Sequence, residues 1–262
     1  MNLNLKGKQA LVCGASAGIG RATAVALAEM GAQVTLVARS AEKLDQVARE
    51  LPQPHGQTHS YLVADFDDSV GLESKLSQHL AKGHQYAILI NNTGGPPGGP
   101  AHQAKVEEYL TAFRRHLIAN HIISQLLIPG MRSLGYGRIV NVISTSVKAP
   151  LPNLGVSNTV RGAVANWAKT LSRELGPAGI TVNNVLPGAT ETERLDSIVA
   201  TKAQKTGQPE EEVRDGMRSA IPLGRFARPE EVAEAIAFLA SPAAAYISGV
   251  NLPVDGGRTP NL

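Results

Sequence analysis

Apolar runs of strand length alternate with amphipathic stretches of helical length along most of the chain. This alternation is typical of a parallel sheet built from β-α-β units. It predicts a first strand at 9–13, a helix at 21–30, and a second strand at 33–38 whose apolar residues suit burial on both faces. Further strands are predicted at 60–64, 87–91, 138–143, 181–186 and 250–254. The pattern therefore predicts an α/β fold with a doubly wound parallel sheet and helices on both faces.

Two segments depart from this alternation. The stretch 94–100 is rich in Gly and Pro, but strand and helix signals continue at the same spacing on both sides of it. We interpret it as a loop over the edge of the sheet and not as a linker between domains. The stretch 191–216 carries many charges and few core-sized side chains, which predicts a mobile flap. A single domain over 1–262 is therefore expected, a length that many single α/β domains reach.

Composition and charge exclude several classes of function. The 262 residues are 43% hydrophobic with a formal charge of +3, and the basic residues are spread without the Lys/Arg block of a nucleic-acid footprint. No apolar run approaches the roughly 18 residues of a membrane span, and the first residues lack the order of a signal peptide. The only cysteine, Cys13, suits a small buried hydrophobe in a reducing compartment. We expect a cytoplasmic protein with neither nucleic acid nor a membrane as partner.

A glycine loop lies between the first strand and its helix. Gly14 permits a tight turn out of the strand, Gly18 allows the backbone to approach a pyrophosphate, and Gly20 allows the helix to pack closely on the sheet. The helix beginning near Ile19 directs its N-terminal amides toward that phosphate. These features predict a dinucleotide site in a Rossmann-type fold. A tight strand-to-helix turn without a ligand is the alternative.

With the rest of the chain, this loop resembles the short-chain dehydrogenase/reductase family. The ordered motifs are the glycine loop, Asp65 after the third strand, and the segments 91–94, 138–144, 182–188 and 247–257. The resemblance covers essentially the whole chain. Within the family, the segment 221–232 resembles that of bacterial 3-oxoacyl-[acyl-carrier-protein] reductases.

The resemblance implies which residues bind the cofactor. Asp65 and Phe66 lie along the adenine, Asn92 near the ribose, and 187–192 around the nicotinamide carboxamide. Arg39 ends the second strand where an acidic residue would bind a ribose 2′-hydroxyl, which favours NADP(H) over NAD(H) because a guanidinium pairs with a 2′-phosphate. A solvated residue at the helix start is the alternative for Arg39. The predicted cofactor-binding residues are Gly14, Ser16, Ala17, Gly18, Ile19, Gly20, Arg39, Asp65, Phe66, Asn92, Gly94, Pro187, Gly188, Thr190 and Thr192.

The catalytic positions depart from the family pattern. The family's Tyr hydroxyl donates a proton to the forming alkoxide, a Lys lowers its pKa, and a Ser on the fifth strand holds the oxygen. Here the Ser is Ser144, whereas Ser157 stands at the Tyr position and Arg161 at the Lys position. His116 stands at the position of the family's structural Asn. None of the five tyrosines is a convincing substitute.

A rebuilt site can be derived from the spacing of these residues. Ser157 and Arg161 are four apart on a helix and therefore share a face, so with Ser144 they can stabilise an oxyanion. His116 can feed a proton through water, its ordinary pKa being about 6.5. Two alternatives stay open, namely a packing role for His116 and an Arg161 that binds only the cofactor ribose or an acidic substrate group. Lys148 is a further candidate cation, or a solvated loop residue.

The sequence is compatible with two functions. The first is an NADPH-dependent reductase of a small carbonyl or acyl thioester, with a nonstandard active site. The second is a catalytically silent NADP(H)-binding sensor or subunit of a mixed assembly. Arg194, Lys202 and Lys205 can attract an acidic or phosphopantetheine substrate, although acidic neighbours dilute their charge. The resemblance also implies a homo-oligomer, a dimer or tetramer, joined through the helices that begin near Glu107 and Ser157.

Overall fold

The structure, a computed structural model, describes residues 1–261. In that part of the chain seven parallel strands form one sheet in the order β3-β2-β1-β4-β5-β6-β7. The strands are β1 (Gln9–Cys13), β2 (Gln33–Ala38), β3 (Ser60–Val63), β4 (Ile88–Asn91), β5 (Gly137–Val142), β6 (Ile180–Pro187) and β7 (Asn251–Val254). The strand order reverses between β1 and β4, which confirms the doubly wound sheet.

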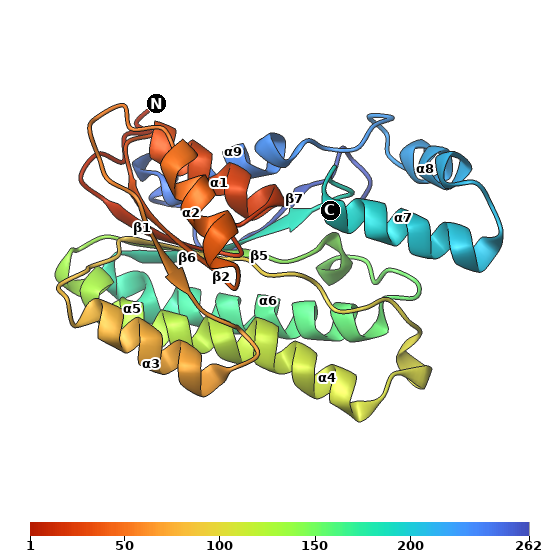
Figure 1. The fold of residues 1–262 in the computed structure, drawn as a ribbon, viewed down its shortest axis with the longest axis horizontal. Helices are drawn as coiled ribbons and strands as arrows, with labels where there is room; N and C mark the ends of the chain where they lie inside the picture. The colour runs from red at the N-terminus through yellow and green to blue at the C-terminus, as the bar shows by residue number, and fades with distance from the viewer. Residues whose placement is uncertain (262) are drawn as a thin grey trace.

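Helices cover both faces of this sheet (Figure 1). They are α1 (Gly18–Glu29), α2 (Ala41–Glu50), α3 (Ser69–Leu80), α4 (Val106–Phe113), α5 (Ala119–Ser133), α6 (Gly155–Leu175), α7 (Glu193–Thr206), α8 (Glu210–Ser219) and α9 (Pro229–Ala240). Helices α1, α2 and α9 lie on one face, and α3 to α6 lie on the other (Figure 1). The first helix begins at Gly18, three residues before the predicted start, so its first amides belong to the glycine loop itself.

Alternate residues of the central strands supply two separate apolar layers. On β1, Ala10 and Val12 pack beneath α1 and α9, whereas Leu11 and Cys13 pack against α3 and α5. Cys13 is the buried hydrophobe that its sequence context predicts, and burial raises the pKa of its thiol to about 12. The strands are therefore buried on both faces, as their continuous apolar runs require.

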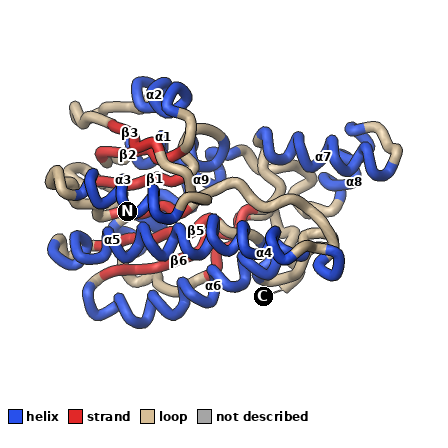
Figure 2. The backbone as a smooth tube through the Cα atoms, turned by 60° about the horizontal axis from the view of Figure 1, so that its bottom comes forward, coloured by secondary structure: helices blue, strands red, loops and turns tan. Residues whose placement is uncertain are grey.

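The segment 191–216, for which the sequence predicts a mobile flap, is largely helical. It contains α7 and the first part of α8, and these two helices project past the sheet (Figure 2). Leu195, Val199 and Ala203 recur at four-residue spacing and bury a narrow stripe against Val213 of α8. The charged residues on the remaining faces conceal this stripe in the sequence, because three small or medium apolar side chains suffice for a two-helix contact.

A ladder of asparagines crosses the sheet from β4 to β7. Asn91 Nδ2 donates to Asn141 Oδ1 at 2.9 Å, and Asn141 Nδ2 donates to Asn184 Oδ1 at the same distance. Asn184 Nδ2 then donates to Asn251 Oδ1 at 2.8 Å. The four residues are direct partners in the strand register. Since Asn91, Asn141 and Asn184 are buried, each amide relies on its neighbour for hydrogen bonding.

Replacing the centre of this ladder tests its contribution to stability. The change Asn141→Ala leaves Asn91 Nδ2 and Asn184 Oδ1 without these partners, and each unsatisfied buried group costs roughly 1–3 kcal/mol. We expect urea unfolding to show a loss of about 2–5 kcal/mol. The exposed Asn166→Ala, as a control, changes the free energy of unfolding by about 0.5 kcal/mol or less. A loss no larger than that of the control contradicts the role of the ladder.

Candidate active site

The glycine loop is held by close backbone contacts at the point where the strand order reverses. Gly14 and Gly18 have φ values of +60° and +54°, a region that favours glycine. A Cβ on Gly14 would lie 2.7 Å from the carbonyl oxygen of Asn92, and one on Gly20 would lie 2.1 Å from the carbonyl oxygen of Gly14. Asn92 Nδ2 donates to the carbonyl oxygens of Cys13 and Gly14, each at 3.3 Å. The loop therefore lies close to β4 and leaves no room for a larger residue.

A cleft of about 360 Å³ opens beside this loop at the carboxyl edge of the sheet. Its lining residues are Gly14, Ser16, Ala17, Ala38, Arg39, Ser40, Lys43, Asp65, Phe66, Thr93, Gly94 and Arg115. Seven of these were expected along a dinucleotide, and Gly18, Ile19 and Gly20 start α1 immediately next to them. The N-terminal amides and dipole of α1 favour a phosphate at this position. The cleft therefore fits the phosphates and adenosine of a dinucleotide.

The segment 187–192 meets the glycine loop from the β6 side. The amide of Gly188 donates to the carbonyl oxygen of Val254 at 2.9 Å, and Thr190 forms a bridge with Ala227. A Cβ on Gly18 would lie 3.1 Å from Cγ2 of Thr192. The structure thus brings 187–192 and the glycine loop together, as the prediction of a shared cofactor site requires.

Positive charge surrounds the adenosine end of the cleft. Arg115 Nε donates to Asp67 Oδ1 at 2.8 Å, and this hydrogen bond holds the pKa of the Asp67 carboxyl below its usual range. The charges of Arg39 and Arg114 act on the same carboxyl in the same direction. Arg39 is exposed and directly precedes Ser40, whose Oγ accepts from the amide of Lys43 and caps α2. A helix N-terminus and several cations therefore face the same end of the cleft.

The residues at the expected catalytic positions lie at the carboxyl edge of β5. Ser144 follows the strand by two residues, and its Oγ accepts from the amide of Ser146 at 3.1 Å. Arg161 is buried, and its Nη1 donates to the carbonyl oxygen of Val142 at 2.9 Å. Burial, followed by the charge of Arg194, lowers the pKa of Arg161 to about 10, so the guanidinium remains charged at neutral pH. Ser157 lies one helical turn before Arg161 on α6 and is half-buried.

His116 lies in a π-helical turn, η2 (Arg114–Ile118), between α4 and α5. Such turns are frequent at functional sites. The side chain is 1% exposed, and its Nε2 has no hydrogen-bond partner. Burial, together with the charges of Arg161 and Arg115, lowers the pKa of His116 to about 2. The ordinary pKa assumed from the sequence is therefore wrong for this site, and the ring is neutral at physiological pH.

Arg194 of α7 lies close to Arg161, a proximity that the sequence does not predict. Its Nη2 donates to the carbonyl oxygen of Pro96 at 2.7 Å and so connects α7 to the loop at 94–100. Its charge lowers the pKa of Arg161. Lys202 and Lys205 lie further along α7 and are exposed. The sequence names Arg194 only as one of three cations that can attract an acidic substrate, and it does not predict the contact with Pro96 or the proximity to Arg161.

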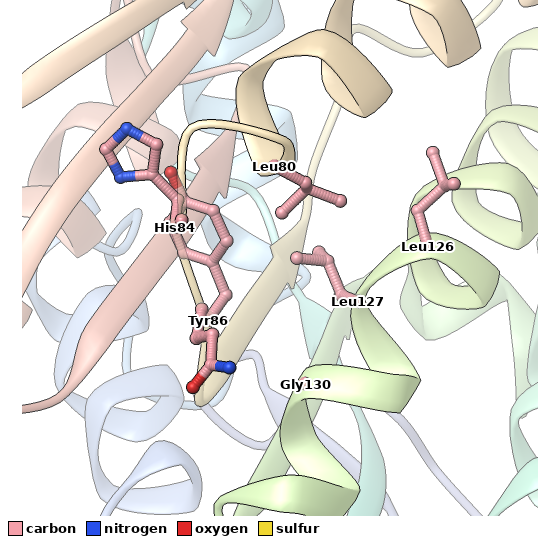
Figure 3. Close-up of a pocket in the computed structure, with 8 residues that line it drawn as sticks. Leu80, His84, Tyr86, Leu126, Leu127 and Gly130 are labelled. Carbon is pink, nitrogen blue, oxygen red and sulfur yellow. The ribbon is translucent and has the colours of Figure 1, made fainter.

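A second cavity, of about 230 Å³, lies at the amino end of β4, at the opposite edge of the sheet. Figure 3 shows Leu80 of α3 and Leu127 of α5 on its walls, with His84 and Tyr86 beside them. The Tyr86 hydroxyl lies 2.6 Å from His79 Nε2 and donates to Thr35 Oγ1 at 2.8 Å. These contacts satisfy the buried hydroxyl, and the cavity is remote from the glycine loop.

The described residues 1–261 contain no group of three potential His, Cys, Asp or Glu ligands that could hold a metal ion. Within the same residues, no helix is both long enough and apolar enough to cross a membrane.

Comparison with known proteins identifies relatives over the whole chain. Residues 14–259 match the family model described as Enoyl-(Acyl carrier protein) reductase. The chain is 34% identical to the 3-oxoacyl-[acyl-carrier-protein] reductase FabG of Pseudomonas aeruginosa, covering 97% of this chain and 98% of that protein. It is 35% identical to L-xylulose reductase of Cavia porcellus, covering 98% of each. The structure of L-sorbose reductase from Gluconobacter frateurii, complexed with NADPH and L-sorbose, superposes with a TM-score of 0.92 at 29% identity and covers 100% of both chains.

The lowered pKa of His116 predicts a specific acid sensitivity. Between pH 6.5 and about 2 the unfolded chain binds a proton at this ring that the folded chain does not, so stability is lost as pH falls below 6.5. The loss approaches about 1.4 kcal/mol per pH unit. His59 and His79 also have lowered pKa values and add to the slope of the native protein, so chemical unfolding at pH 7, 6 and 5 is expected to show a slope that is steeper in the native protein than in His116→Gln by the contribution of His116. The exposed His102→Gln, as a control, keeps the native slope. Equal slopes for all three proteins contradict the assignment.

Proposed function

The chain belongs to the short-chain dehydrogenase/reductase family, and from this we propose that it is an NADPH-dependent reductase of carbonyl compounds, similar to 3-oxoacyl-[acyl-carrier-protein] reductases, with a nonstandard catalytic site. The observation that carries the proposal is the cleft at the reversal of strand order. There the glycine loop and a cationic rim line the cleft, and Gly94 of its lining is followed by Gly95, which lies beside Arg161. The proposed substrate class is a small carbonyl compound or an acyl thioester.

The cleft supports NADP(H) as the cofactor. Gly14, Gly18 and the first amides of α1 would hold the pyrophosphate, and Asp65 and Phe66 would lie along the adenine. Arg39, beside the N-terminus of α2, would pair with the 2′-phosphate. The segment 187–192 would hold the nicotinamide end. When bound, this cofactor supplies the hydride.

The chain's own residues would stabilise charge on the reacting oxygen. Ser144 and Ser157 present hydroxyls and Arg161 a fixed positive charge at the same edge of the sheet, an arrangement suited to a developing oxyanion. Ser157 cannot replace a tyrosine as an acid, since an aliphatic hydroxyl ionises far less readily than a phenol with a pKa of about 10. A lost general acid costs roughly a hundred- to ten-thousand-fold in rate, which leaves measurable turnover.

His116 would relay the proton in a form that differs from the one its sequence position suggests. A neutral imidazole carries a proton on one nitrogen and accepts at the other, so it can pass a proton through water without becoming a stable cation. The unpartnered, buried Nε2 and the electrostatic effect of Arg161 on this ring support the role. The relay therefore requires only a change of tautomer.

Two further proposals accompany this function. Exposed apolar side chains at Val106, Leu110 and Ile118, along α4 and the turn after it, support a homo-oligomer, either a dimer or a tetramer. The single reduced cysteine suits a cytoplasmic setting.

A second candidate function is a silent NADP(H)-binding subunit or sensor. Ser157 and Arg161 favour it, because neither a phenol nor a lysine is present at these two positions.

An assay of NADPH oxidation separates these functions. With a short 3-oxoacyl thioester and a panel of small carbonyl compounds, we expect turnover above the buffer rate. The double change Ser157→Tyr with Arg161→Lys is expected to lower this turnover, because it removes the charge around which the site is built. An increase would mean a dormant scaffold with the family's ordinary chemistry. Tight NADPH binding without any turnover would support the silent subunit.

The cofactor preference has its own test. Arg39→Glu replaces a cation beside the predicted 2′-phosphate with an anion, and hydrogen bonds to charged groups contribute about 1.5–3 kcal/mol. We expect the ratio of the NADH to the NADPH dissociation constant to fall by about 10- to 100-fold, measured by fluorescence titration. Arg49→Gln, at the far end of α2 where Arg49 pairs with Asp45, is the matched control and leaves the ratio unchanged. An unchanged ratio in Arg39→Glu refutes the pairing of Arg39 with the 2′-phosphate, and a native ratio at or below one refutes the NADP(H) preference.

A further inference from the structure

Two guanidinium groups from distant parts of the chain meet at Gly95. Arg161 comes from α6 and Arg194 from α7. A Cβ built on Gly95 would lie 3.7 Å from Nη2 of each arginine, with no other atom among its neighbours within 4 Å. A small group bound at this point would therefore contact both guanidinium groups at once. The other terminal nitrogen of Arg161, Nη1, donates to the carbonyl oxygen of Val142 at the end of β5.

Neither guanidinium has a carboxylate partner within residues 1–261. Arg161 donates to the carbonyl oxygen of Val142 and Arg194 to that of Pro96. Other arginines of the chain do form ion pairs with Asp or Glu, namely Arg21, Arg49, Arg115, Arg214, Arg218, Arg225 and Arg228. The two arginines at Gly95 thus differ from these others, because only backbone carbonyl dipoles offset their charges.

This arrangement is unfavourable without an anion. Arg161 is 8% exposed, and burial of a cation without a charged partner opposes folding. The second cation nearby adds repulsion and lowers the pKa of Arg161 further. The charge of Arg161 also lowers the pKa of His116, whose buried Nε2 has no hydrogen-bond partner. A bound anion would offset the repulsion and supply an acceptor to these donors.

The position and shape of the site select the kind of anion. The phosphates of a dinucleotide are already provided for by the glycine loop and the cations around Arg39. The Gly95 site is connected instead to the end of β5, because Arg161 contacts both Gly95 and the carbonyl oxygen of Val142. The planar fork of a guanidinium matches the two oxygens of a carboxylate. A substrate carboxylate is therefore the anion that fits.

We propose that Arg161 and Arg194 form a carboxylate-binding subsite, and that the substrate of this enzyme is a carbonyl compound carrying a free carboxylate. The proposal rests on the proposed reductase function, because the carboxylate belongs to the molecule that is reduced. The subsite orients this molecule with its acid group at Gly95 and its carbonyl oxygen toward Ser144 and Ser157. Specificity then depends on α7 and the loop at 94–100, which Arg194 holds together.

The test compares acids with their neutral esters. Six-carbon 2-oxo, 3-oxo and 4-oxo carboxylates are assayed with NADPH beside their methyl esters. We expect the best acid to exceed its ester in kcat/KM by at least about 10-fold, since charge-assisted hydrogen bonds contribute about 1.5–3 kcal/mol. Arg194→Gln should lower kcat/KM for the acid by about 10-fold more than it lowers kcat/KM for the ester, because any loss of the Arg194 contact with Pro96 affects both substrates alike.

Filling the volume at Gly95 gives an independent variant that removes no charge. Gly95 has an ordinary φ, and a methyl group there makes only van der Waals contact, so Gly95→Ala is expected to fold. The methyl occupies the volume between the guanidiniums and should also lower kcat/KM for the acid selectively. Gly99→Ala, in the same loop with nothing within 4 Å of the new methyl, is the matched control.

Several results would overturn the proposal. Equal turnover of acids and esters would do so, as would equal losses for both in Arg194→Gln. A loss of NADPH affinity alone in that variant would reassign Arg194 to the cofactor phosphates. If no carbonyl compound is reduced, the reductase function fails, and the subsite is tested by calorimetric titration with hexanoate and hexanamide. Binding of hexanoate but not of hexanamide, with the affinity for hexanoate lowered about 10-fold in Arg194→Gln, supports the subsite. If hexanoate does not bind, the subsite is refuted.

Discussion

The close approach of the glycine loop to β4 is the constraint on which the rest of the site depends. All seven strands are parallel, so their carboxyl ends lie at one edge, and at the reversal between β1 and β4 the following helices go to opposite faces. Gly14 and Gly20 leave no space for a Cβ, and Asn92 ties the loop to β4. The same edge then receives the end of β5 and the segment after β6. A binding cleft at this point follows from the topology.

The charges along this edge would allow one surface to serve the two proposed ligands. At the proposed adenosine end, Arg39 and its basic neighbours surround an exposed cleft, where a phosphate would remain partly hydrated. At the other end, Arg161 is buried and Arg194 lies close to it without a carboxylate from the described residues. A buried cation is a stronger selector of an anion than an exposed one, because its charge is less screened. In the site that we propose, Ser157 lacks the acidity of a phenol, and Arg161 supplies a charge that stays fixed at neutral pH.

The sequence predicted the sheet well and the chemistry of the site only in part. Strands buried on both faces appear as uninterrupted apolar runs, so each predicted strand lies within a residue or two of the observed one. The helices α7 and α8 were missed because their buried stripe is narrow. The meeting of Arg161 with Arg194 depends on how α6 and α7 pack around Gly95, which no local pattern records. The lowered pKa of His116 likewise arises from burial and from charges distant in sequence.

We propose that a nicotinamide cofactor and an anionic carbonyl compound meet at the end of β5 in a site built around Arg161. A crystal structure of the protein with NADPH and an unreactive carboxylate analogue of the substrate would show both ligands at once. We expect the nicotinamide between 187–192 and Ser144, with the carboxylate oxygens within hydrogen-bond distance of both Arg161 and Arg194. A carboxylate bound elsewhere, with Arg161 contacting only the ribose of the cofactor, would contradict it.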